Sequence, residues 1–160
     1  MSSSYQVNSQ LEQRPSAYRF VGKGQWFPSS ILTNPTDGTV IVDTGSVLAR
    51  RLARCAADAL QMALRVARAG TRVNEIGRAV EREVRRQGFS VVRGLAGHGV
   101  GRTIHEWPSV PNQYVARQKD VLTDGLVLTI EPIISAGSPD PVQDVVGWTI
   151  RTRDGSLAAH

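Results

Sequence analysis

Two apolar stripes with helical spacing lie next to each other in the middle of this chain and constrain its fold more than any other feature. The first runs from about Leu48 to Ala69, and the second from about Thr71 to Gly88. In each, apolar side chains recur in steps of three and four, which places them along one face of a helix. Gly70 and Gly88 are suitable helix ends. Thr71 or Asn74 is expected to cap the second helix.

Short apolar or β-branched runs flank this pair of helices and predict strands. Because the runs do not alternate with helices, the pattern has no βαβ rhythm. The expected class is α+β, with the helices on one face of a curved antiparallel sheet. The expected strands are Thr39–Val42, Phe89–Val92, Leu126–Ile130 and Gly147–Arg153.

The length of 160 residues is enough for a single domain with a proper core. Residues 1–18 are polar and lack periodicity, so we expect a flexible N-terminal tail followed by one domain over residues 19–160. The lone cysteine, Cys55, falls in an apolar helical stripe and is expected to be a small buried thiol.

The net charge is +5, and almost all of the positive charge is arginine. Acidic residues are interspersed among these arginines, which favours a solvated helix face over a nucleic-acid surface. No apolar run is long enough to span a bilayer, and the N-terminus has no secretory signal pattern. We therefore expect a cytoplasmic protein with no membrane partner.

Three places carry side chains suited to catalysis or metal binding. His98 lies between two glycines, and His105 follows seven residues later. Glu131 ends an apolar run just before a proline, and Asp43 ends another. A buried carboxylate is expensive unless it is paired or bound to a metal. The alternatives are a glycine-rich hairpin with two incidental histidines, and two carboxylates at exposed strand ends.

Together these stretches resemble the signature of type I methionine aminopeptidases. The resemblance rests on residues 97–102 with His105, Glu106 and Pro108, on residues 121–132, and on residues 147–149 and 154–160. It implies the pita-bread fold of the creatinase and aminopeptidase family M24. It also implies a truncated member, which lacks one metal-bearing hairpin and the C-terminal strand.

The resemblance further assigns individual residues. In this family five side chains hold two metal ions, and His98, Glu131 and Asp43 match three of them. A second alignment of the strand before the first helix would retain neither family aspartate. His105 and Trp148 match residues that contact the substrate, and His105, His98 and Glu131 are the expected catalytic residues. His160 is a further candidate metal ligand.

Both bridging carboxylates of the family are missing, so the expected cofactor is at most one Mn, Fe, Co or Zn ion, or none if the site is degenerate. The expected function is a methionine-aminopeptidase-like hydrolase that acts on a peptide N-terminus. Two alternatives stay open. One is a repurposed enzyme that uses histidine and glutamate as acid–base groups on another small molecule. The other is a non-catalytic binding module. A homo-oligomer is also expected, because an absent edge hairpin would expose sheet surface.

Overall fold

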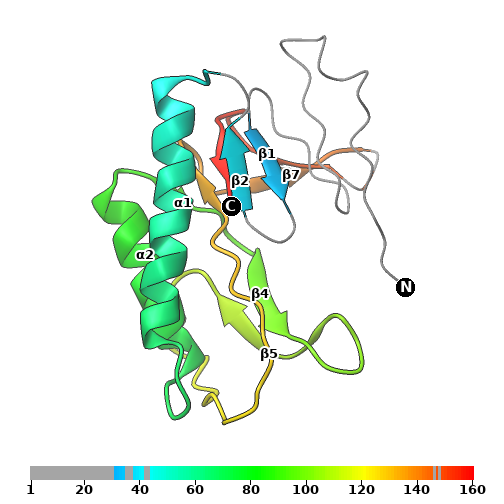
Figure 1. Cartoon of the computed structure of the whole chain (residues 1–160). Coiled ribbons are helices and arrows are strands. Elements are labelled where there is room, and N and C mark those ends of the chain that lie inside the picture. Colours follow the sequence, from blue (N-terminus) through cyan, green and yellow to red (C-terminus); the bar gives the residue numbers. More distant parts are fainter. Residues whose placement is uncertain (1–30, 35–37, 42–43, 146, 148) are drawn as a thin grey trace.

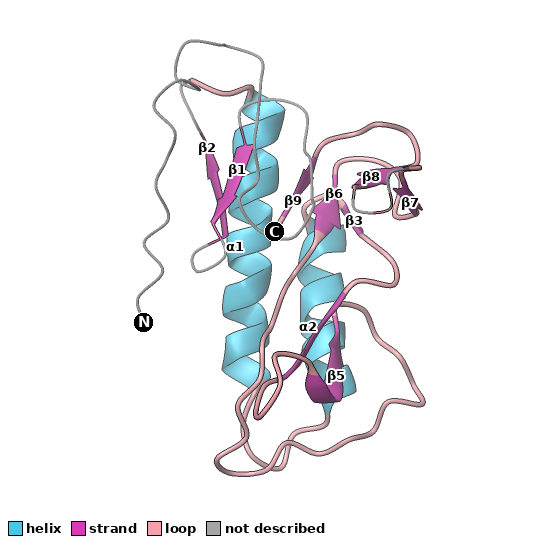
Figure 2. Cartoon of the chain, turned by 90° about the vertical axis from the view of Figure 1, so that its right-hand side faces the viewer, coloured by secondary structure: helices cyan, strands magenta, loops and turns pink. Residues whose placement is uncertain are grey.

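The computed structural model describes residues 31–34, 38–41, 44–145, 147 and 149–160. Two helices, α1 (Val47–Val66) and α2 (Val73–Arg86), lie side by side along one face of a set of short strands (Figures 1 and 2). The strands are β1 (Ile31–Asn34), β2 (Gly38–Ile41), β3 (Ser90–Val91), β4 (Ala96–Gly99), β5 (Glu106–Pro111), β6 (Ile134–Ser135), β7 (Pro141–Gln143), β8 (Ile150–Thr152) and β9 (Ala158–Ala159).

Every pairing between these strands is antiparallel. β3, β6 and β9 form a three-stranded sheet with β6 in the middle, and the pairs β1–β2, β4–β5 and β7–β8 form separate two-stranded sheets. α1 contacts β6 and β9, whereas α2 contacts β3 and β5. This arrangement confirms the predicted α+β class. The predicted N-terminal tail, residues 1–18, lies outside the described residues.

α1 forms as its sequence predicts, with a capped start and one apolar face. The Ser46 hydroxyl accepts a hydrogen bond from the Ala49 N–H at 3.0 Å, which satisfies one of the free donors of the first turn. The apolar stripe is buried from Leu52 to Ala63. The helix ends at Val66, a little earlier than expected, and a turn through Gly70 follows, where φ is +87°.

The predicted N-cap of α2, Thr71 or Asn74, is wrong, whereas the helix stops before Gly88 as predicted. Arg72 occupies the N-cap position, and no side chain caps the helix there. A distant backbone segment provides the acceptor instead, because the Val73 N–H donates to the Asp120 carbonyl at 2.9 Å. The next residues of that segment continue the pairing, with the Leu122 N–H donating to the Thr71 carbonyl at 2.8 Å. A backbone carbonyl from a distant segment therefore replaces the side-chain acceptor that an N-cap residue would provide.

The core lies between the two helices and the strands beneath them. Its side chains are small or β-branched for the most part, which lets α1 and α2 approach closely. The cluster comprises Leu52, Cys55, Ala56, Ala59, Ala63, Val73, Ile76, Val80, Val84, Phe89, Val91, Val110, Leu122, Ile134 and Ala159.

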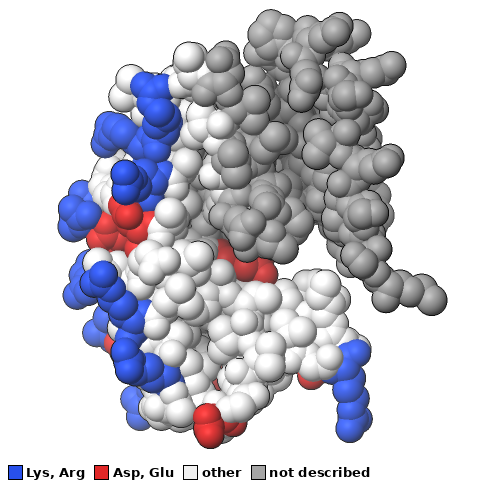
Figure 3. All heavy atoms as spheres, in the orientation of Figure 1, with Lys and Arg blue, Asp and Glu red and all other residues white. Residues whose placement is uncertain are grey.

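Most of the basic side chains in the view of Figure 3 gather along the outer faces of the helices. Three of these arginines form ion pairs with glutamates one helical turn away: Arg78 with Glu75, Arg85 with Glu81, and Arg86 with Glu83. Such pairs are typical of a solvated helix face. No described helix is long and apolar enough to cross a membrane.

The predicted strand Leu126–Ile130 is not a regular strand. It runs beside β4 through two hydrogen bonds, Val100 N–H to the Val127 carbonyl at 2.9 Å and Thr129 N–H to the His98 carbonyl at 2.7 Å. Only an isolated bridge between Gly99 and Leu128 meets the pattern of a ladder. The segment is nevertheless extended enough to bring Glu131 to the edge of β4.

Candidate functional site

His98 and Glu131 face each other at the edge of β4. The His98 Nε2 atom lies 3.4 Å from the Glu131 Oε1 atom. The His98 side chain is 15% exposed and that of Glu131 is 32% exposed, so both are largely withdrawn from solvent while remaining reachable. The structure therefore brings together two residues that are separated by more than thirty positions in the chain.

The backbone on both sides of His98 is fixed by Thr129. The His98 N–H donates to the Thr129 hydroxyl at 2.9 Å, while the Thr129 N–H donates to the His98 carbonyl. A side chain at Gly97 would collide with the Thr129 carbonyl, and one at Gly99 would collide with the Trp107 carbonyl. The glycines beside His98 are thus required for two backbone segments to approach closely.

A hydrogen bond also orients the His98 ring. Its Nδ1 atom lies 2.9 Å from the Gly99 carbonyl oxygen, which can only accept, so Nδ1 carries the hydrogen. In the neutral ring Nε2 then presents a lone pair toward Glu131. A lone pair and a carboxylate oxygen are both acceptors, so a proton or a cation between them stabilises the arrangement.

The backbone of Glu131 is fixed by the side chain of Asn112. The Asn112 amide donates to the Glu131 carbonyl at 2.5 Å and to the Leu95 carbonyl at 3.1 Å. Asn112 is only 2% exposed, so it acts as an internal brace between β5 and the two segments that carry the site. Sequence reasoning missed both Asn112 and the bracing role of Thr129. The placement of Thr129 two positions before Glu131, on the same face of an extended segment, was the available signal.

His105 joins the pair from the exposed loop between β4 and β5. Its ring centroid lies 4.1 Å from that of His98, with 47° between the ring planes. The loop is shaped by the Thr103 hydroxyl, which donates to the His105 carbonyl at 3.0 Å. The glycine-rich hairpin considered from the sequence does exist, and its two histidines meet in space. Asp43 and Trp148 lie outside the described residues.

His160 lies near this cluster. Burial lowers the pKa of its imidazole, while the negative charge of Glu131 acts in the opposite direction. Its Nδ1 atom is buried and has no hydrogen-bond partner among the described residues. Its backbone is fixed by Thr39, whose hydroxyl donates to the His160 carbonyl at 2.7 Å and accepts from the His160 N–H at 2.8 Å.

The fit of a metal ion to this cluster depends on how many donors converge. Within the described ranges, no group of three or more His, Cys, Asp or Glu side chains is in position to hold an ion. His98 and Glu131 nevertheless have a suitable spacing, because a tetrahedron with bonds of about 2.1 Å has edges of about 3.4 Å. The bond from the His98 Nδ1 to a carbonyl is also typical of a metal-binding histidine. The pair therefore fits one cation as two of its donors.

Cys55 does not take part in this chemistry. It is fully buried between the helices, and burial raises the pKa of its thiol to about 12. The thiolate, which is the nucleophilic form, is therefore absent at neutral pH. This agrees with the buried thiol expected from the helical stripe.

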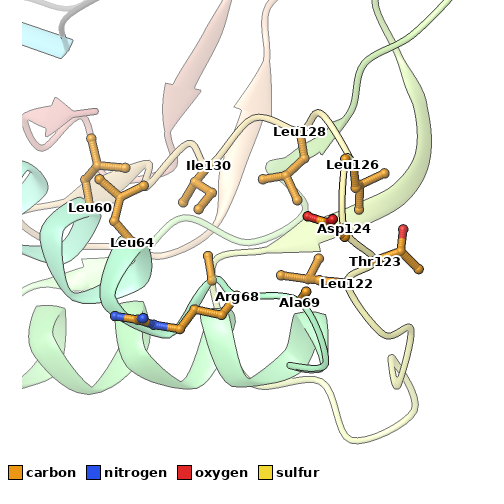
Figure 4. A pocket seen from close by; sticks show the side chains of 12 residues that line it. Leu60, Leu64, Arg68, Ala69, Leu122, Thr123, Asp124, Leu126, Leu128 and Ile130 are labelled. Atoms are coloured by element: carbon orange, nitrogen blue, oxygen red, sulfur yellow. The ribbon is translucent and has the colours of Figure 1, made fainter.

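An apolar cavity of about 510 Å³ lies on the other side of the segment that carries Glu131. Figure 4 shows Leu60 and Leu64 of α1 facing Leu128 and Ile130 across it. Thr129 and Glu131, which alternate with these residues, belong to the histidine side. The cavity and the histidine cluster thus share one stretch of backbone and use opposite faces of it.

Comparison with known proteins places this chain in a family. The sequence model of metallopeptidase family M24 matches residues 17–156. The methionine aminopeptidase of Aquifex aeolicus is 40% identical over 124 residues, which cover 76% of this chain and 48% of that protein. Methionine aminopeptidase 2 of Bacillus subtilis is 40% identical over 121 residues, or 75% of this chain and 49% of that protein.

Solved structures agree. The methionine aminopeptidase of Thermotoga maritima superposes with a TM-score of 0.72 at 36% identity, covering 76% of this chain and 49% of that one. The prolidase of Pyrococcus furiosus gives 0.54 at 28% identity, covering 61% and 28%. These neighbours confirm the predicted pita-bread fold, and the chain spans about half the length of the curated relatives it matches. This protein belongs to metallopeptidase family M24.

Proposed function

We propose that this chain is a methionine-aminopeptidase-like hydrolase domain that binds at most one divalent cation and acts on the amino terminus of a peptide. The observation that carries the proposal is the 3.4 Å contact between the His98 Nε2 lone pair and the Glu131 carboxylate. The names of the relatives support the substrate class. Asp43 is proposed as a further ligand of the same ion.

Each residue of the cluster has a distinct proposed role. A bound Mn, Fe, Co or Zn ion would polarise the substrate carbonyl and lower the pKa of water at the site. His98 and Glu131 would hold that ion, and Glu131 would also accept a proton from the attacking water. His105, beside His98, would donate a hydrogen bond to the developing oxyanion. Trp148 would contact the substrate side chain.

One observation favours a second candidate function. Only two donors converge among the described residues, and a histidine facing a carboxylate can also exchange protons without a metal. The alternative is therefore a repurposed enzyme in which His98, His105 and Glu131 act as acid–base groups on another small molecule.

Metal binding and peptide hydrolysis, measured on the same samples, test the proposal. The metal-stripped chain is titrated with Mn²⁺, Fe²⁺, Co²⁺ and Zn²⁺ by calorimetry, and hydrolysis of a short methionyl peptide is assayed with each ion. We expect at most one ion per chain and metal-dependent release of methionine. His98→Ala and Glu131→Gln should each weaken binding at least about 10-fold.

Arg82→Ala is the matched control, because Arg82 is exposed on α2 and takes no part in the contacts among His98, His105 and Glu131. It should bind and hydrolyse as the wild type does. Lack of both metal binding and peptide hydrolysis in a folded wild-type chain would overturn the proposal. Turnover that persists in chelator would support the metal-free alternative instead.

A further inference from the structure

We propose that Asn112 is a positioning residue that holds Glu131 beside His98 through its side-chain amide. The inference rests on the function proposed above, because it concerns the two donors of that same site. Asn112 contacts the backbone of Glu131 and acts through that residue.

The backbone ladder between β4 and the segment that carries Glu131 stops short of the carboxylate. Its last hydrogen bond runs from the Thr129 N–H to the His98 carbonyl at 2.7 Å. In the antiparallel register of this ladder, Ala96 comes opposite Glu131. Within the described part of the chain, however, no backbone hydrogen bond joins these two residues. The ladder alone therefore leaves the backbone of Glu131 unattached to β4.

The side chain of Asn112 supplies the missing attachment. Asn112 directly follows β5, which pairs with β4. Its Nδ2 atom donates to the Glu131 carbonyl at 2.5 Å and to the Leu95 carbonyl at 3.1 Å. Leu95 directly precedes β4. One amide group therefore ties Glu131 to the start of the strand that carries His98.

The surroundings of this amide allow it only a donor role. Both of its partners are carbonyl oxygens, which can only accept, so Nδ2 must face them. The Oδ1 atom of Asn112 is buried and has no hydrogen-bond partner among the described residues. Burying an unpaired acceptor lowers stability. A side chain kept at that cost, beside a candidate functional residue, indicates a role in positioning.

Loss of the Asn112 amide has a definite structural consequence. The nearest backbone link between Glu131 and β4 would then be that of Thr129, two residues earlier. The carboxylate would no longer be held 3.4 Å from the His98 Nε2 atom. Aspartate has nearly the shape of asparagine but would direct an oxygen at both carbonyls, so repulsion should push the segment away. Because donors that are held in place bind a cation more tightly, the loss should also weaken cation binding.

Crystal structures of the metal-free full chain test the positioning directly. We compare the wild type with Asn112→Asp and Asn112→Ala, and measure the distance between the His98 Nε2 and Glu131 Oε1 atoms. The wild type should show the contact of 3.4 Å. Both variants should show a separation beyond about 4 Å, the limit for an ion pair. Asn112→Ala introduces no charge, so it keeps the test decisive if Asn112→Asp does not fold.

Asn74→Ala is the matched control. Asn74 is also a buried asparagine, 3% exposed, and its Oδ1 atom also lacks a partner among the described residues. It lies in the first turn of α2 and takes no part in the contacts of the site. Its loss disturbs a buried position of the same kind but should leave the distance between His98 and Glu131 unchanged.

Calorimetric titration with Zn²⁺ and Mn²⁺ measures the effect on binding. Partners that orient a metal ligand typically contribute about 10- to 100-fold in affinity, so both Asn112 variants should bind more weakly by about that factor. Asn74→Ala should bind as the wild type does. Urea unfolding of the same samples reports stability, and a merely structural residue would lower stability without changing the affinity.

The outcomes also separate this inference from the function on which it rests. If the folded Asn112 variants keep both the 3.4 Å contact and the wild-type affinity, Asn112 does not position Glu131 and the proposed function stands. If the folded wild type neither binds a cation nor hydrolyses a methionyl peptide, the proposed function fails. The distances in the crystal structures then decide this inference on their own.

Discussion

Glu83 is a carboxylate on the buried side of α2, only 6% exposed, and two neighbours on its own helix hold it there. Arg86 donates to both of its oxygens, at 2.6 and 3.0 Å, and the Gln87 amide donates at 2.7 Å. The hydrogen bonds from Arg86, followed by the one from Gln87, lower the pKa of Glu83 from 4.5 to about 2. The folded chain therefore keeps this group ionised well into acid.

This lowered pKa predicts an acid-dependent loss of stability. A carboxyl group whose folded pKa lies below its unfolded value stabilises the fold above the unfolded pKa. We expect the free energy of unfolding to fall as the pH drops from about 4.5 to about 2. Glu83→Gln should flatten that slope in urea titrations at several pH values. Glu75→Gln, at an exposed position of the same helix, should keep it. Equal slopes in all three proteins would contradict the assignment.

Some residues of the site could be predicted from the sequence, and others could not. His98, His105 and Glu131 stand in motifs whose resemblance to a family assigns them, and the structure brings these three together. Asn112 and Thr39 carry no such signal, because their partners lie at least 17 and as many as 121 residues away. A contact of that range depends on the finished fold and leaves no local pattern.

At the level of elements, periodicity predicted the two helices but did not predict the short strands or the N-cap of α2. α1 and α2 repeat their apolar residues over several turns, so each pattern is long enough to be unambiguous. The strands β3, β6 and β9 have two residues each, too few for any alternation to appear. The sequence also could not predict how the first turn of α2 is satisfied. The acceptor for the Val73 N–H is the Asp120 carbonyl, which comes from a distant segment.

The position of Gly77 leads to a prediction about how closely α2 and β5 approach each other. Replacing an exposed glycine inside a helix with alanine usually stabilises by about 1 kcal/mol. Here a Cβ would lie 2.9 Å from the Pro111 carbonyl and still closer to that of Gln113, where β5 and the residues after it pass α2. Gly77→Ala should therefore destabilise by about 1–3 kcal/mol in urea unfolding. Arg82→Ala, on the exposed face, should change stability by less than about 0.5 kcal/mol. A stabilised Gly77→Ala would show that β5 can move away.

At the level of the whole molecule, one hydroxyl group connects the two ends of the described chain. Thr39 in β2 bonds both the carbonyl and the N–H of His160, across 121 residues of sequence. β2 otherwise contacts α1 and pairs only with β1 among the described strands. Among the described residues, this pair of bonds links the hairpin β1–β2 to the end of β9.

Thr39→Val tests that attachment. Valine keeps the shape of threonine but leaves the His160 N–H and carbonyl without their partner. We expect a loss of about 1–3 kcal/mol in the free energy of unfolding, and faster proteolysis near β2. Thr39→Ser retains the hydroxyl and should stay close to the wild type on both measures. If valine and serine behave alike, the two bonds do not hold the hairpin.

The same pair of bonds bears on the order in which parts of the chain fold during synthesis. α1 and α2 are neighbours in the chain, so they can associate as soon as both have left the ribosome. Thr39 is synthesised 121 residues before His160, so its hydrogen bonds cannot form until the whole segment between them has been made. Closing so long a loop also carries an entropic cost, which the packing of the helices and strands has to offset. The hairpin that begins the described chain is therefore expected to be among the last parts to settle.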